Sequence, residues 1–148
     1  MSFLVLAATA AISASAVPRA APAHSLEVQH RGAAYTVDYV TRIETRAKAI
    51  GISPPARTSS RRCILTAQVS VERRIQPAGG ARAIATVLPG TRTFTQSQPG
   101  DCRRDDRQRG EFVAGKADAI SDHVRELASA DHHDTLAAID AARDFAAN

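Results

Sequence analysis

Aromatic residues are scarce in this 148-residue chain, which contains no tryptophan, two tyrosines and four phenylalanines. Proteins that bind single-stranded nucleic acid stack the bases on aromatic rings set among basic residues. Tyr35 and Tyr39 do not lie within a basic cluster. The sequence therefore argues against nucleic acid as a partner, even though the formal net charge is +4 at pH 7.

The sequence also lacks the short motifs of common enzyme chemistries. It contains no P-loop, dinucleotide-binding fingerprint, C-x-x-C or H-E-x-x-H motif, and no G-x-S-x-G nucleophile elbow. Its carboxylate pairs, Asp105 with Asp106 and Asp131 with Asp134, have the composition of helix N-termini, where negative charge complements the helix dipole. We therefore expect a non-catalytic domain without a cofactor; the alternative is a small enzyme with an unrecognised site.

Long apolar runs are absent except near the amino terminus, between Phe3 and about Ile12. This run is shorter than the roughly 20 residues of a transmembrane helix. Small residues and two A-x-A cleavage sites follow it, although no lysine or arginine precedes it. We interpret residues 1–23 as a cleaved signal peptide; cleavage after Ala16 is the alternative to cleavage after Ala23.

A signal peptide predicts an exported bacterial protein, periplasmic or extracellular, without a transmembrane anchor. Residues 24–148 then have the length of one ordinary domain. The two cysteines, Cys63 and Cys102, would pair in an oxidising compartment. Such a bond closes a loop of about 40 residues and stabilises the fold by roughly 4 kcal/mol in the chain-entropy model.

Alternation of apolar and polar residues predicts strands in the first part of the chain, and a period near 3.6 predicts helices in the last part. Residues 40–50 fit both periods, and we favour a long strand there. The expected strands are 26–30, 35–50, 63–71 and 83–88 with an extension at 91–95; the expected helices run from about 105 to 128 and from 132 to 146. The predicted fold is α+β, with an antiparallel β-meander of about four strands packed against a C-terminal two-helix hairpin.

Positive and negative charges are distributed unevenly along the chain. Residues 24–110 contain 15 Arg and Lys against 7 Asp and Glu, whereas residues 111–148 contain 3 against 8. A disulfide would bring together two arginine pairs that flank the cysteines, Arg61 with Arg62 and Arg103 with Arg104. These four arginines form a candidate anion-binding site, and the expected partner is an anionic envelope component or another exported protein.

One histidine gives a hypothesis about metal binding. Cleavage after Ala23 would make His24 the amino-terminal residue, whose α-amine and imidazole resemble the copper ligands of histidine-brace proteins. Such a site needs a further histidine within reach. His30 lies about 20 Å further along an extended strand, which makes it a poor second ligand. Copper binding through His24 is therefore a minor alternative.

Overall fold

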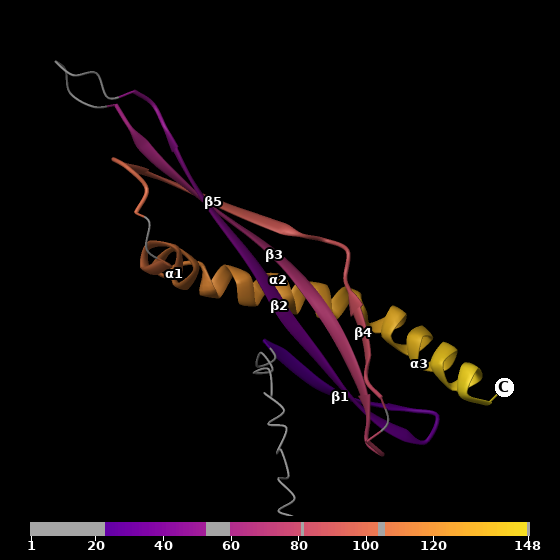
Figure 1. The fold of residues 1–148 in the computed structure, drawn as a ribbon. Helices are drawn as coiled ribbons and strands as arrows, with labels where there is room; N and C mark the ends of the chain where they lie inside the picture. Colours follow the sequence, from indigo (N-terminus) through magenta and orange to yellow (C-terminus); the bar gives the residue numbers. More distant parts are fainter. Residues whose placement is uncertain (1–22, 53–59, 81, 104–105, 148) are drawn as a thin grey trace, which may run out of the picture.

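The fold is described from a computed structural model, which places residues 23–52, 60–80, 82–103 and 106–147 (Figure 1). The predicted signal peptide therefore lies outside the described residues, apart from Ala23, and so does Arg104. The residues that the structure describes form a five-stranded antiparallel sheet with three helices on one side of it. The α+β class predicted from the sequence is confirmed.

Two long strands form the spine of the sheet. β2 (Ala33–Ile50) and β3 (Arg62–Pro77) pair from Tyr35 opposite Pro77 to Ile50 opposite Arg62. At about 3.4 Å per residue, β2 is about 60 Å long. The segment 40–50 is therefore strand, as predicted, because it pairs along its whole length with the strongly alternating β3.

Shorter strands flank this spine. β1 (His24–His30) pairs with β2 over residues 33–39, and β4 (Ile84–Val87) and β5 (Arg92–Pro99) pair with successive parts of β3. The break between β4 and β5 falls at Gly90, whose φ is +103°. Nε2 of the buried His123 donates a hydrogen bond to the Gly90 carbonyl at 2.9 Å. This bond attaches the segment between β4 and β5 to the helix that contains His123.

The helices differ from the predicted hairpin. They are α1 (Asp106–Ala114), α2 (Ala117–Ala130) and α3 (His132–Ala147), so the first predicted helix is divided near Gly115. Asp131 alone separates α2 from α3. Its φ and ψ of −80° and −2° are right-handed helical, and hydrogen bonds of the i to i−4 kind run through it. A hairpin needs a turn of several residues; here α3 continues onward from α2 (Figure 1).

The apolar side of the sheet carries two core clusters beneath the helices. One cluster joins β1, β2 and β3 to α2 and α3 around Val37, Ile75, Val124 and Ile139. The other joins β3 to α1 around Leu65 and Phe112, and it includes Cys63. Cys63 and Cys102 form the predicted disulfide, with their Cα atoms 4.8 Å apart. This bond fastens the start of β3 to the segment that leads from β5 into α1.

Candidate anion-binding face

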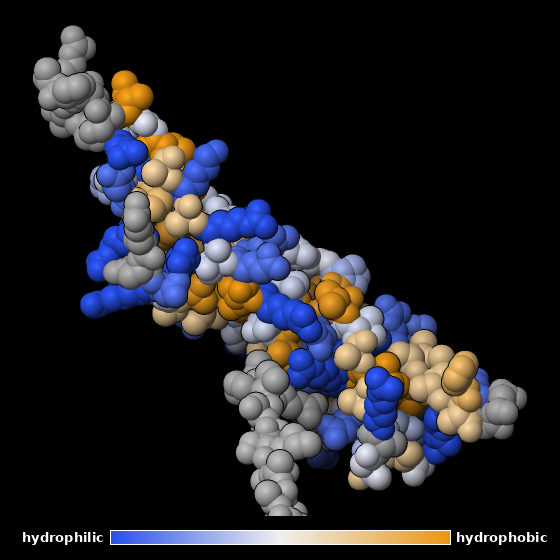
Figure 2. All heavy atoms as spheres, viewed as in Figure 1, coloured by the Kyte–Doolittle hydropathy of each residue, from blue (hydrophilic) through white to orange (hydrophobic). Residues whose placement is uncertain are grey.

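The side of the sheet turned away from the helices is polar over the part where β5 flanks β3. Strand side chains alternate between the two sides of a sheet. The odd-numbered positions of β3 from Cys63 to Ile75 are buried beside the helices, so its even-numbered positions face outward. We call this outward surface the polar face (Figure 2).

The strand register arranges the polar face in rungs of side chains. The rungs are Lys48, Ile64 and Ser97; Arg46, Thr66 and Thr95; Glu44, Gln68 and Thr93; and Arg42 with Ser70. In two of the three complete rungs, a cation on β2 and a hydroxyl group on β5 lie on opposite sides of β3. Neighbouring strands lie about 4.8 Å apart, so with β3 between them these groups are roughly 10 Å apart, and an extended ligand can contact both.

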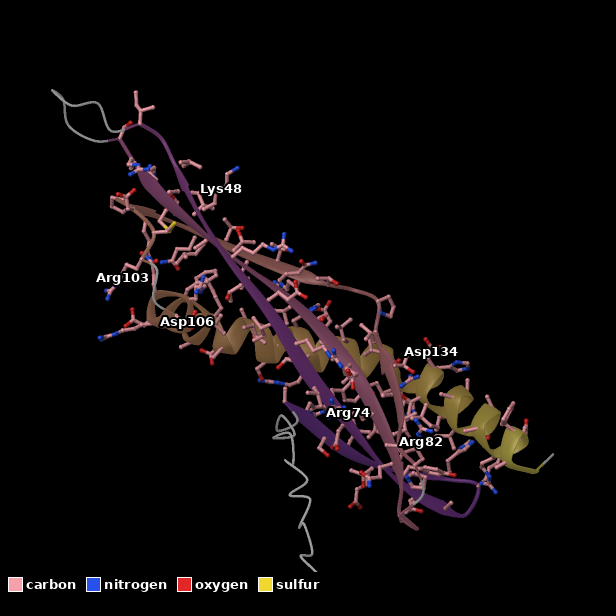
Figure 3. The ribbon with its side chains drawn as sticks, viewed as in Figure 1. Lys48, Arg74, Arg82, Arg103, Asp106 and Asp134 are labelled. Carbon is pink, nitrogen blue, oxygen red and sulfur yellow. A yellow bond between two sulfur atoms is a disulfide. The ribbon has the colours of Figure 1, made fainter. Side chains whose placement is uncertain are left out.

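The cations of the polar face are well exposed. The side chain of Arg46 is 80% exposed and lies 3.9 Å from Glu44, which is itself largely exposed. Lys48 projects from the upper part of the hairpin formed by β2 and β3 (Figure 3). Exposed pairs such as Arg46 with Glu44 contribute little to stability, which leaves these side chains able to exchange partners.

A buried glutamate lies next to the polar face. Glu72 accepts hydrogen bonds from Arg74, at 2.7 Å, and from Arg42, and its side chain is 7% exposed. The hydrogen bond from Arg74, and then that from Arg42, hold the pKa of Glu72 below its ordinary value of 4.5, although burial opposes this. Glu72 therefore stays charged near neutral pH and orients two guanidinium groups at the edge of the face.

Of the four arginines predicted as an anion site, the three that the structure describes lie on different surfaces. Nε of Arg62 donates to Ser97 Oγ at 2.9 Å, which places Arg62 on the polar face. Arg61 lies 2.9 Å from Asp101 in an ion pair. Arg103 lines a cleft on the helix side of the sheet, away from Lys48 (Figure 3). The disulfide brings these three residues to one end of the molecule, and Arg104 lies outside the described residues.

The cleft beside Arg103 lies between β5 and α1 and has a volume of about 400 Å³. Its lining is mainly amide and charged: Gln96, Gln98, Arg103, Gln108, Glu111, Phe112 and Gly115. The Gln108 amide donates to Gln98 Oε1 and accepts from the Arg103 backbone N–H, both at 3.0 Å. Glu111 accepts a hydrogen bond from Arg107 at 2.8 Å. Side chains of this kind can form hydrogen bonds with a polar molecule. The sequence alone did not indicate this cleft.

A buried polar network ties the sheet to the bend between α2 and α3. Arg73 Nη1 donates to both carboxylate oxygens of Asp131, at 2.8 and 3.0 Å. Thr135 and Tyr39 donate to the same carboxylate at 2.9 and 3.2 Å, and burial raises the pKa of Tyr39. Asp131 therefore lies near a helix N-terminus, as the sequence suggests, and its carboxylate also accepts hydrogen bonds from Arg73, Thr135 and Tyr39. The network is enclosed between layers, and its role is structural.

The histidine predicted as a copper ligand lies at the start of β1. The ring of His24 lies 6.1 Å from that of Tyr39, its neighbour across the strands. Within the described ranges, no group of three or more His, Cys, Asp or Glu side chains could hold a metal ion. His30, the second histidine considered, lies 2.8 Å from Asp140 of α3. Copper binding by a mature amino terminus stays a prediction.

Comparison of the chain with protein-family models, with curated proteins and with solved structures gave no match. None of the helices in the described part of the chain has the length and hydropathy needed to cross a membrane.

Proposed function

We propose that this chain is an exported, non-catalytic bacterial domain that binds an anionic polysaccharide of the cell envelope through its polar face. Export is supported by the signal-like residues 1–23 and by the disulfide, since disulfides persist in oxidising compartments. The observation that carries the binding proposal is the alignment of cations with hydroxyl groups on shared rungs of the sheet.

The chemistry of these rungs suits a charged sugar polymer. Arginine and lysine form charge-assisted hydrogen bonds with carboxylate and phosphate groups. Serine, threonine and glutamine side chains both donate and accept hydrogen bonds, so they suit sugar hydroxyl groups. Lys48 with Ser97, and Arg46 with Thr95, provide both kinds of contact on one surface. A lipid bilayer would favour apolar side chains for insertion, whereas a polymer can bind along a flat polar surface.

The charge distribution supports an oriented approach. The strands carry most of the basic residues, while α2 and α3 carry acidic residues that include Asp118, Asp122, Asp134, Asp140 and Asp144. A polyanion is attracted by the basic strands and repelled by the acidic helices α2 and α3. The helices also lie on the other side of the sheet from the polar face (Figure 1). The polar face is therefore the surface that would meet an anionic polymer.

The proposal is tested by measuring the affinity for polygalacturonate, with neutral dextran and phosphatidylglycerol vesicles as comparison ligands. Changing Lys48→Ser and Arg62→Ser together should weaken polygalacturonate binding by at least about tenfold, equivalent to about 1.4 kcal/mol. Added salt should weaken binding by the wild-type protein, because exposed charges are screened.

The matched control carries Lys116→Ser and Arg125→Ser on the helix side, and it changes the net charge by the same amount. This control should bind polygalacturonate nearly as well as the wild-type protein. An equal loss of affinity in both variants would contradict a localised face. Equal binding to dextran, or preferential binding to the vesicles, would contradict an anionic polysaccharide as the ligand.

A further inference from the structure

The strand wall of the cleft between β5 and α1 carries amides at positions that face the helices. Gln96 and Gln98 of β5 lie opposite the buried Leu65 and Cys63 of β3, so they share the helix side of the sheet. Strand residues that pack against a core are normally apolar. Here two glutamines line an open cleft of about 400 Å³, within the range of about 300–1,000 Å³ that is typical of small-molecule sites.

The opposite wall of the cleft is one face of α1. Gln108, Glu111 and Phe112 are spaced as i, i+3 and i+4, so they lie on the same side of the helix, and Gly115 follows at its end. Gly115 does not have a positive φ, and a Cβ there would lie 3.4 Å from the Glu111 carbonyl oxygen, an ordinary contact. A side chain can therefore be added at Gly115 to fill the cleft.

The hydrogen bonds of the cleft determine which way its amides point. The backbone N–H of Arg103 can only donate, so the Gln108 atom that it contacts at 3.0 Å is the carbonyl oxygen. The NH₂ group of Gln108 then donates to Gln98 Oε1, also at 3.0 Å. Neither the NH₂ group of Gln98 nor the amide of Gln96 has a hydrogen-bond partner among the residues that the structure describes. These amides are available to a ligand.

The two ends of the cleft differ in charge. Arg103 and Gln98 lie at the end where Gln108 begins the helical wall. About one turn further along α1, roughly 5 Å along the helix axis, Glu111 supplies a carboxylate. Glu111 is paired with Arg107, but both side chains are largely exposed, at 64% and 74%. Exposed pairs of this kind contribute little to stability, so Glu111 can exchange Arg107 for a ligand.

We propose that this cleft binds a short peptide with a free carboxyl terminus. The terminal carboxylate would accept hydrogen bonds from the NH₂ group of Gln98 and would be attracted by the guanidinium of Arg103. The charged amino group of a dipeptide would lie near Glu111, since two extended residues span roughly 7 Å. Gln96 would pair with the peptide amide, because a glutamine side chain both donates and accepts hydrogen bonds.

The mixed charge of the cleft favours a peptide over the other polar ligands. A neutral sugar would use the amides but neither Arg103 nor Glu111. A polyanion would be repelled by Glu111, whereas the polar face offers it several cations. A zwitterion with a carboxylate at one end, an ammonium group at the other and an amide between them matches every kind of group in the lining.

Titration with L-alanyl-L-alanine tests the proposal. The side-chain amide signals of Gln96, Gln98 and Gln108 are followed by nuclear magnetic resonance, and they should shift until the site is saturated. The same dipeptide with an amidated carboxyl terminus should bind at least about tenfold more weakly, because hydrogen bonds to a charged group are the stronger ones. Glucose serves as the neutral sugar and should leave the three signals unchanged.

Two variants locate the site, with circular dichroism as a check of folding. Gln98→Glu keeps an oxygen that accepts from Gln108 but replaces the NH₂ donor by a negative oxygen, so it should weaken dipeptide binding at least about tenfold. Gln29→Glu makes the same change of charge at an exposed position on β1 and should bind as the wild-type protein does. Gly115→Leu fills the cleft without changing a charge and should also weaken binding.

Three results would overturn the inference. They are the absence of saturable shifts up to the solubility of the dipeptide, equal binding of its amidated form, and shifts caused by glucose in place of the dipeptide. An equal loss of affinity in Gln98→Glu and Gln29→Glu would also contradict it, because the effect would then be one of net charge. Polygalacturonate binding is measured with a different ligand and on the other side of the sheet, so the two proposals fail separately.

Discussion

Arg73 on β3 and Asp131 between α2 and α3 form an ion pair of 2.8 Å in which both side chains are more than nine-tenths buried. The pair connects the centre of the sheet to the point where one helix passes into the next. Two hydroxyl groups complete the coordination of the carboxylate, those of Tyr39 and Thr135. The orientation of α3 therefore depends on a polar contact inside the core.

Removing one partner of this pair should be strongly destabilising. Asp131→Ala leaves the Arg73 charge buried without compensation, at a cost of about 3–5 kcal/mol in the free energy of unfolding. Urea denaturation measures this change. The exposed Asp134, one turn away, provides the control, and Asp134→Ala should alter the same quantity by less than about 0.5 kcal/mol. Equal effects of the two variants would contradict a structural role for the pair.

Loss of the disulfide should loosen one end of the molecule more than the other. Cys63 and Cys102 are 39 positions apart, so replacing both by alanine should cost about 4 kcal/mol of stability. Amide hydrogen exchange should accelerate most in α1, which follows the bonded segment and packs on Cys63 and Leu65 through Phe112. Exchange in α3 should change only with global stability. A uniform acceleration at both ends would contradict this account.

The break between β4 and β5 requires glycine. Gly90 has a φ of +103°, and a Cβ at this position would lie 3.1 Å from Leu127 Cδ2. Gly90→Ala should therefore lower the free energy of unfolding by more than about 1 kcal/mol. Gly79 lies in a turn with open space around it, so Gly79→Ala is the matched substitution. Thermal unfolding of the two variants should show a clearly lower midpoint for the first only.

Glu72 should make stability depend on pH in the acid range. Its pKa is lowered in the folded protein, chiefly by the hydrogen bond from Arg74, so its stabilising effect is fully present above the ordinary value of 4.5. The effect is lost as pH falls through the lower folded pKa. Glu72→Gln should flatten that part of the stability profile below pH 4.5. An unchanged acid profile in this variant would show that Glu72 is not the group responsible.

Most strands of the sheet could be predicted from the sequence, but the register in which they pair could not. The alternation of apolar and polar residues predicted a strand at 63–71, which is part of β3, and a strand at 83–88 with an extension at 91–95, which corresponds to β4 and β5. The polar face depends on which residue of β2 shares a rung with which residue of β5, across β3. That relation is set by the whole sheet, so Arg46 and Thr95 could not be paired from the sequence.

Two local signals were misleading for physical reasons. Arg73 and Arg74 resemble a solvated basic pair, but strand alternation puts Arg73 on the core side, where it meets Asp131. The residues around Asp131 resemble a turn between antiparallel helices. The backbone stays helical there because Arg73 and Thr135 hold the Asp131 carboxylate. Arg73 is far away in the sequence, and Thr135 lies in the next helical turn, so the residues next to Asp131 do not indicate these contacts.

The most direct test of the account is the location of the ligand on the protein. Backbone amide shifts in nuclear magnetic resonance spectra should be followed while a galacturonate oligosaccharide is added. The account predicts that the changes cluster on the polar face, over residues 42–48 of β2, 64–70 of β3 and 93–97 of β5. Changes confined to the cleft lined by Gln98 and Gln108, or no changes at all, would contradict it.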